Sequence, residues 1–143
     1  MLARKVDPGT ATCVFTSPEP KAAETARVLA SAWSVEVETI DGFREHERPD
    51  ARMLRPEDFE RRIGELFARP SEIVFGTESA DAARQRFTDA VVRVIRRTVG
   101  DVVIVSHGTV IALFVADATG VEPFAFWKRQ EMPGAVILSV PDQ

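Results

Sequence analysis

The stretch VVIVSHGTV (residues 102–110) places four apolar residues directly before a serine, a histidine and a glycine. A short run of apolar, mostly β-branched residues is typical of a strand covered on both faces of a sheet. A helix is expected to start after Gly108, so His107 would lie at the carboxyl end of a strand, where open α/β sheets bind their ligands. The free N–H groups at the start of that helix favour an anion. A histidine that only makes local hydrogen bonds is the simpler alternative.

The N-terminal part of the chain predicts a strand, a helix and another strand. Residues 11–16 form a short, mostly apolar run, and Ser17 is expected to cap the following helix with its side-chain oxygen. Apolar residues then recur at helical spacing as far as Trp33. Residues 35–39 alternate as in a half-exposed strand. A strand–helix–strand unit implies a right-handed crossover and a parallel sheet.

The rest of the chain predicts further helices and a last strand. Residues 42–55 are polar and lack periodicity, which indicates a charged loop. The expected elements are a helix from Pro56 to just before Pro70, a longer helix capped by Thr77 or Ser79 and closed by Gly100, the strand 102–105, a helix over 109–119 that is apolar almost all round and ended by Gly120, a short turn over 124–128 and a strand over 135–140. The predicted fold class is α/β, with three layers in which helices flank a mostly parallel sheet.

Composition narrows the function classes. The 143 residues predict a single domain over 1–143, with 45% apolar and 28% charged residues, as in ordinary globular proteins. The net charge of −4 gives no reason to expect a nucleic-acid partner. The single cysteine, Cys13, is expected to be a small core residue, and two distant histidines with one cysteine suggest no metal site. No apolar run of membrane-spanning length and no signal peptide are apparent, so a cytoplasmic location without a membrane partner is expected.

Four short blocks occur in an order that resembles the histidine phosphatase superfamily, also called phosphoglycerate mutase-like. They are the block Ser17-Pro18-x-x-Lys21-x-x-x-Thr25-Ala26, then Phe43-Arg44-Glu45, then Gly76-Thr77-Glu78-Ser79, and last Ser106-His107-Gly108. The resemblance covers nearly the whole chain. It implies a phosphoglycerate mutase-like sheet and phosphoryl transfer through a histidine. It also implies a small phosphorylated substrate or inorganic phosphate as the partner, with no metal and no organic cofactor.

One departure from this family concerns its Arg-His-Gly motif, whose histidine accepts the phosphoryl group. The chain has only His46 and His107, and neither lies in such a motif. Met1 to Gly9 is similar to the end of the family's first helix, so we expect an N-terminally shortened form that is inactive as it stands. The alternative is a non-catalytic phosphate-binding or interaction protein on the same fold. A missing first strand would leave a sheet edge open, which favours a homodimer.

The resemblance implies a role for four side chains. His107 would contact the phosphoryl group and, when protonated, donate a charge-assisted hydrogen bond to it. Ser17 and Lys21 would bind phosphate, with Lys21 in the place of a family arginine. Lysine is a point charge without the planar fork of arginine, and a solvated helix residue is the alternative interpretation. Glu45 corresponds to the family's acid.

The charged loop leaves other interpretations open. Arg44 and Arg48 would oppose protonation of Glu45 if they paired with it, so Glu47 is an alternative acid. The whole run from Arg44 to Arg48 also reads as a solvated charged loop. His46 lacks the strand and glycine context of a nucleophile. A helix cap accounts for Glu78-Ser79 without a catalytic role.

Overall fold

The computed structural model describes residues 7–130 and 134–139 and contains a parallel sheet. Its three strands lie in the order β2-β1-β3. Their bounds are β1 (Cys13–Thr16), β2 (Glu36–Thr39) and β3 (Val103–Val105). Strand β1 pairs with both neighbours in parallel, with Val14 opposite Val37 on one side and Val103 on the other. The predicted α/β class and the strand–helix–strand unit are confirmed.

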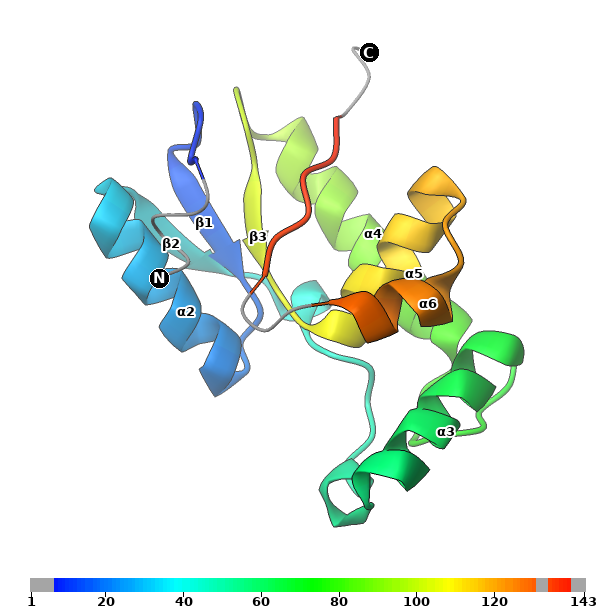
Figure 1. The fold of residues 1–143 in the computed structure, drawn as a ribbon. Coiled ribbons are helices and arrows are strands. Elements are labelled where there is room, and N and C mark those ends of the chain that lie inside the picture. The colour runs from blue at the N-terminus through cyan, green and yellow to red at the C-terminus, as the bar shows by residue number, and fades with distance from the viewer. Residues whose placement is uncertain (1–6, 131–133, 140–143) are drawn as a thin grey trace.

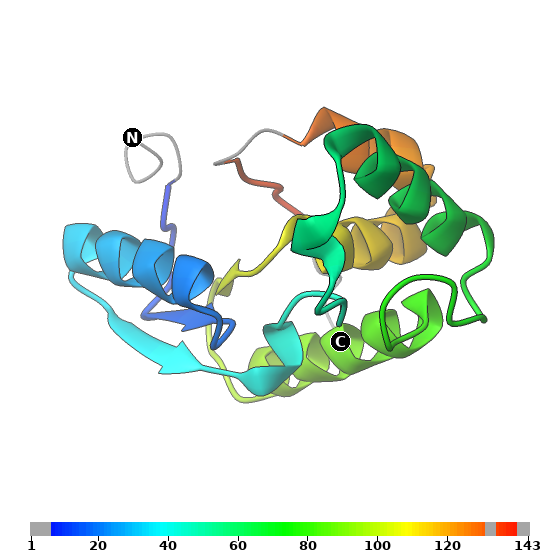
Figure 2. The ribbon, with the colours of Figure 1, turned by 90° about the horizontal axis from the view of Figure 1, so that it is seen from below.

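Helices cover both faces of this sheet. Their bounds are α2 (Pro20–Trp33), α3 (Pro56–Ala68), α4 (Ala80–Arg96), α5 (Gly108–Thr119) and α6 (Pro123–Arg129), with short 3₁₀ turns η1 (Asp41–Phe43) and η2 (Ala51–Met53). Figure 1 shows α2 on one side of the sheet and α4, α5 and α6 on the other. In Figure 2, α5 lies between α4 and the pair formed by α3 and α6. The turn predicted over 124–128 is thus a seven-residue helix.

Alternation along β1 divides the core between the two faces. Val14 packs with Ala26 and Leu29 of α2 in a small cluster. Phe15 points the other way, into a larger cluster that includes Phe87 of α4 and Leu113 of α5. Because successive strand residues face opposite sides, a four-residue strand anchors both layers. This arrangement fixes the carboxyl ends of β1 and β3 side by side.

Helix α5 is largely buried over its first two turns, whereas its last three residues are exposed. Most residues of this helix are apolar. The buried ones are Thr109, Val110, Ala112, Leu113 and Val115. It ends at Gly120, whose φ of +82° is a left-handed conformation that glycine adopts without strain. The helix starts at Gly108, directly after His107 and one residue earlier than expected.

The predicted start of α2 is wrong, whereas that of α4 is confirmed. Helix α2 begins at Pro20, and Ser17 does not cap it. A residue before proline is disfavoured in the helical region, so Glu19 stays extended with φ −66° and ψ 139°. In α4, the Ser79 side chain accepts a hydrogen bond from the N–H of Ala82. Gly100 lies beyond the end of α4 at Arg96 and belongs to the turn before β3.

Two predictions about the sheet are wrong. The last predicted strand is not observed: residues 135–139 form no strand, and Val140 lies outside the described residues. Residues 1–6, which we compared with the end of a first helix, also lie outside the described residues. Asp7 to Gly9 precede β1 without helical structure. Strand β3 is only partly buried, because within residues 7–130 and 134–139 no further strand pairs with its outer edge. Every helix of these residues is too short or too polar to cross a membrane.

Within residues 7–130 and 134–139 the outer edge of β3 has no partner strand, and the homodimer stays a prediction. An unpaired, apolar strand edge tends to pair with another chain. We expect two copies to associate through β3, and sedimentation equilibrium is expected to show a dimer whose dissociation depends on protein concentration. A monomer at every concentration measured would contradict this expectation.

Candidate functional site

The carboxyl ends of β1 and β3 bring Ser17 and His107 into contact. The N–H of Ser17 donates to the carbonyl oxygen of Val105 at 3.0 Å, which joins the two strand ends. His107 Nε2 lies 2.9 Å from Ser17 Oγ. Ser17 is fully buried, whereas 17% of the His107 side chain is exposed. Two of the residues expected at the site are therefore adjacent, and the histidine is the one that a ligand can reach.

Glu19 is a member of this group that the sequence analysis missed. Its Oε2 lies 2.9 Å from His107 Nε2. The same oxygen accepts a hydrogen bond from the backbone N–H of Glu45 at 2.7 Å. The signal was the position of Glu19 inside the Ser17–Lys21 block, two residues after the serine. A single carboxylate oxygen thus joins the ends of β1 and β3 to the charged loop.

Glu45 caps the helix that follows His107. Its carboxylate accepts the N–H groups of Thr109 and Val110, each at 3.0 Å. Arg48 Nη2 lies 3.3 Å from the same carboxylate, and Arg48 Nη1 donates to the Thr109 hydroxyl at 3.0 Å. A negative charge at a helix N-terminus is stabilising. The start of α5, expected to attract an anion, therefore holds an anionic side chain of the chain itself.

Arg86 of α4 holds the loop that carries Glu45. Its guanidinium donates to the carbonyl oxygens of Gly42, Arg44 and Glu45 at 2.9, 2.8 and 3.3 Å. It also forms two hydrogen bonds with the Glu78 carboxylate, at 2.8 and 3.1 Å. Burial alone would raise the pKa of Glu78, but the hydrogen bonds from Arg86 and from the N–H of Glu47 keep that pKa below its usual value. Glu78 therefore helps to hold Arg86 in place, in addition to preceding the helix cap Ser79.

The family follows from a comparison with known proteins. The model of the histidine phosphatase superfamily (branch 1) matches residues 1–140. The chain belongs to the histidine phosphatase superfamily. No curated protein matches it. The predicted family is thereby confirmed, and phosphoryl transfer is the chemistry of the superfamily.

The structure leaves two predicted site residues, Lys21 and the alternative acid Glu47, outside the hydrogen-bonded group. Lys21 is the second residue of α2 and is exposed, and its ammonium group makes no hydrogen bond or ion pair with the described residues. Glu47 is exposed, and its carboxylate accepts the Thr77 hydroxyl rather than contacting His107. Across residues 7–130 and 134–139, no three His, Cys, Asp or Glu side chains are arranged to hold a metal ion. The roles of Lys21 and Glu47 remain predictions.

His46 is a buried histidine on the core side of the same loop. Only 2% of it is exposed, and Nε2 lies 2.6 Å from the carbonyl oxygen of Glu78. Its ring lies 6.0 Å from that of Phe75, and Nδ1 has no partner among the described residues. Burial lowers the pKa of His46 below its ordinary value. A neutral, enclosed imidazole of this kind is a structural residue.

The burial of His46 predicts a pH-dependent stability. The unfolded chain takes up a proton on this histidine below about pH 6.5, whereas the folded protein does so only at lower pH. The free energy of unfolding is therefore expected to fall as the pH decreases below about 6.5. His46→Gln keeps a donor for the Glu78 carbonyl and should flatten this slope, as measured by urea denaturation from about pH 5 to 7. An unchanged slope in His46→Gln would contradict the assignment.

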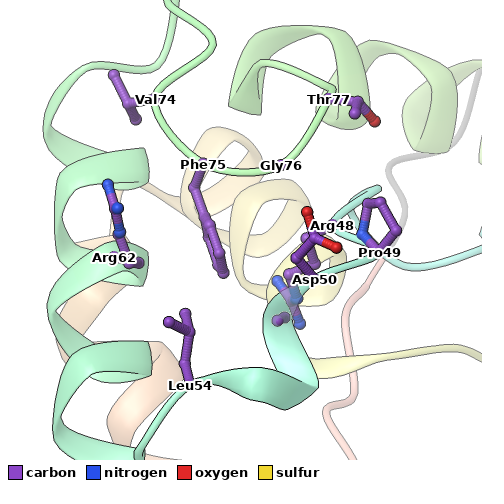
Figure 3. Close-up of a pocket in the computed structure, with 10 residues that line it drawn as sticks. Arg48, Pro49, Asp50, Leu54, Arg62, Val74, Phe75, Gly76 and Thr77 are labelled. Carbon is purple, nitrogen blue, oxygen red and sulfur yellow. The ribbon is translucent and has the colours of Figure 1, made fainter.

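A pocket of about 240 Å³ lies beside the Glu45 loop. Figure 3 shows Arg48, Asp50 and Leu54 facing it from the loop, Arg62 from α3 and Phe75 from the segment before α4. Arg48 connects this pocket to the site, because it lines the pocket and also pairs with Glu45. Its guanidinium lies 5.0 Å from the centre of the Phe59 ring. Apolar walls with a few charged groups are typical of pockets for small ligands.

Proposed function

We propose that this member of the histidine phosphatase superfamily binds the phosphoryl group of a small phosphorylated metabolite, or inorganic phosphate, at His107. The observation that carries the proposal is the 2.9 Å contact between His107 Nε2 and a carboxylate oxygen. An anionic acceptor already lies at this nitrogen, at the carboxyl end of a parallel sheet. A phosphoryl oxygen would make the same charge-assisted hydrogen bond.

The neighbouring residues have different parts in this proposal. The backbone N–H of Glu45 is a second donor at the same point. Lys21 lies on the first turn of α2, close in sequence to Ser17 and Glu19, and its flexible side chain would add a positive charge to the bound group. The superfamily pattern gives Glu45 the role of acid. Its carboxylate is occupied here by donors, so we assign it mainly to holding the loop and α5.

Turnover is a separate question from binding. A covalent phosphohistidine needs an accessible histidine nucleophile. His46 is enclosed, and His107 lies outside an Arg-His-Gly motif. We therefore propose that the chain as it stands binds phosphate without turning over phosphate esters. This outcome agrees with the second candidate function, a non-catalytic phosphate-binding protein on the same fold.

The rest of the substrate would enter the pocket beside Arg48. Five of its lining residues belong to the loop between Gly42 and Arg55, which we expect to set substrate choice: Arg48, Pro49, Asp50, Ala51 and Leu54. Its volume of about 240 Å³ is below that of the usual ligand pocket, so only a small organic group would fit.

Calorimetric titration with inorganic phosphate tests the binding. His107→Ala is expected to weaken phosphate binding about tenfold, because one hydrogen bond to a charged group contributes about 1.5–3 kcal/mol. Lys21→Met should weaken it less, since an exposed cation is screened by solvent. Arg93→Met removes an exposed cation from α4 and is the matched control. Unchanged affinity in His107→Ala would place the site elsewhere.

A further inference from the structure

The carboxylate of Glu19 occupies the point where two donors meet. His107 Nε2 and the backbone N–H of Glu45 both lie within hydrogen-bond distance of Glu19 Oε2, at 2.9 and 2.7 Å. They come from segments far apart in the sequence, one after β3 and the other in the charged loop. Two donors that converge on one oxygen form a site for an anion, and a side chain of the chain itself fills that site.

The Glu19 side chain can rotate away from His107 and from the Glu45 N–H. The Glu19 side chain is 46% exposed, in contrast to the fully buried Ser17. The Glu19 side chain makes no capping hydrogen bond to α2, so the helix does not depend on that side chain. Burial and hydrogen bonding on all sides would hold a side chain in one rotamer, whereas a half-exposed glutamate has room to turn outward.

A phosphate and the Glu19 carboxylate exclude each other. Both are anionic acceptors, and like charges at hydrogen-bond distance repel each other strongly when partly shielded from water. Bound phosphate must therefore displace Glu19 Oε2 before it can accept from His107 and from the Glu45 N–H. The free energy of the contacts that Glu19 loses reduces the apparent affinity for phosphate.

We propose that Glu19 is an internal competitor that occupies the phosphoryl-oxygen position and swings out when a phosphate group binds. The proposal rests on the phosphate-binding function proposed above. It adds a residue that sets the affinity of the site and favours ligands with more negative charge than a single carboxylate, such as phosphate monoesters. Free carboxylic acids would displace Glu19 poorly, because their carboxylate would form the same hydrogen bonds with His107 and the Glu45 N–H that Glu19 already forms.

The test is a calorimetric titration of inorganic phosphate into the wild type, Glu19→Gln, Glu19→Ala and Glu24→Gln. Glu24 lies on α2, the helix that follows Glu19, and is exposed, so Glu24→Gln removes the same charge without touching His107. Phosphate affinity is expected to rise about tenfold in both Glu19 variants, the size of one charge-assisted hydrogen bond, and to stay within about twofold in Glu24→Gln.

The outcomes separate this inference from the function on which it rests. Binding that is unchanged in both Glu19 variants, or that rises equally in Glu24→Gln, would overturn the competitor role and leave phosphate binding intact. An absence of phosphate binding in all four proteins would overturn both. The imidazole resonances of His107 give a second readout without phosphate, because Glu19→Gln should shift them and Glu24→Gln should not.

Discussion

Arg86→Met is expected to lower the free energy of unfolding by about 3–5 kcal/mol, because it leaves a buried carboxylate without its partner. The side chains of Arg86 and Glu78 are only 15% and 13% exposed, and their shortest contact is 2.8 Å. Three backbone carbonyl groups of the loop lose their donor as well. Urea denaturation monitored by circular dichroism measures the loss.

Arg84→Met is the matched control for this prediction. Arg84 lies on the same helix, two residues earlier, and pairs with the exposed Asp117 at 3.6 Å. Exposed ion pairs contribute about 1 kcal/mol or less, so Arg84→Met should have a small effect. Equal losses in the two variants would mean that Arg86 does not hold the Glu45 loop.

Incubating the chain with an aryl phosphate ester is expected to give no turnover above the uncatalysed rate and no acid-labile phosphohistidine. Histidine phosphatases depend on a covalent intermediate, and rate enhancements of at least about 10⁶-fold are lost when an enzyme lacks its nucleophile. Absorbance of the released phenol and a phosphate label on the protein measure the two quantities. His46→Ala and His107→Ala should give the same baseline as the wild type.

A saturable turnover that either substitution abolishes would contradict this prediction. Loss in His46→Ala would mean that the buried loop opens and exposes its imidazole. Loss in His107→Ala, together with a label on that residue, would make His107 the nucleophile rather than a phosphate-contacting group.

Local sequence patterns predicted the part of the fold that local patterns control. The run before Ser106, the helical spacing after Ser17 and the apolar stretch of α5 each correspond to an observed element. Residues 135–139 have a strand composition yet form no strand. A strand needs a paired neighbour as well as a suitable composition, and pairing is a long-range property that apolar residues alone do not specify.

The candidate site was predicted only in part for the same reason. Ser17 and His107 were found because each follows an apolar strand in a short block. Glu19 binds the N–H of Glu45, 26 residues away, and Arg86 binds the carbonyl of Gly42, 44 residues away, so neither role follows from local periodicity. The burial of His46 could not be predicted from local sequence, because it depends on how the loop folds over Phe75.

Phosphate binding at His107 is tested most directly by nuclear magnetic resonance of the imidazole groups. The chain contains only two histidines, so imidazole resonances measured during a phosphate titration report on each one separately. His46 is buried and hydrogen-bonded to Glu78, which makes it an internal control. We predict that the His107 signals shift saturably while those of His46 stay fixed. Signals of His107 that do not respond to phosphate, or that shift no more than those of His46, would contradict the account.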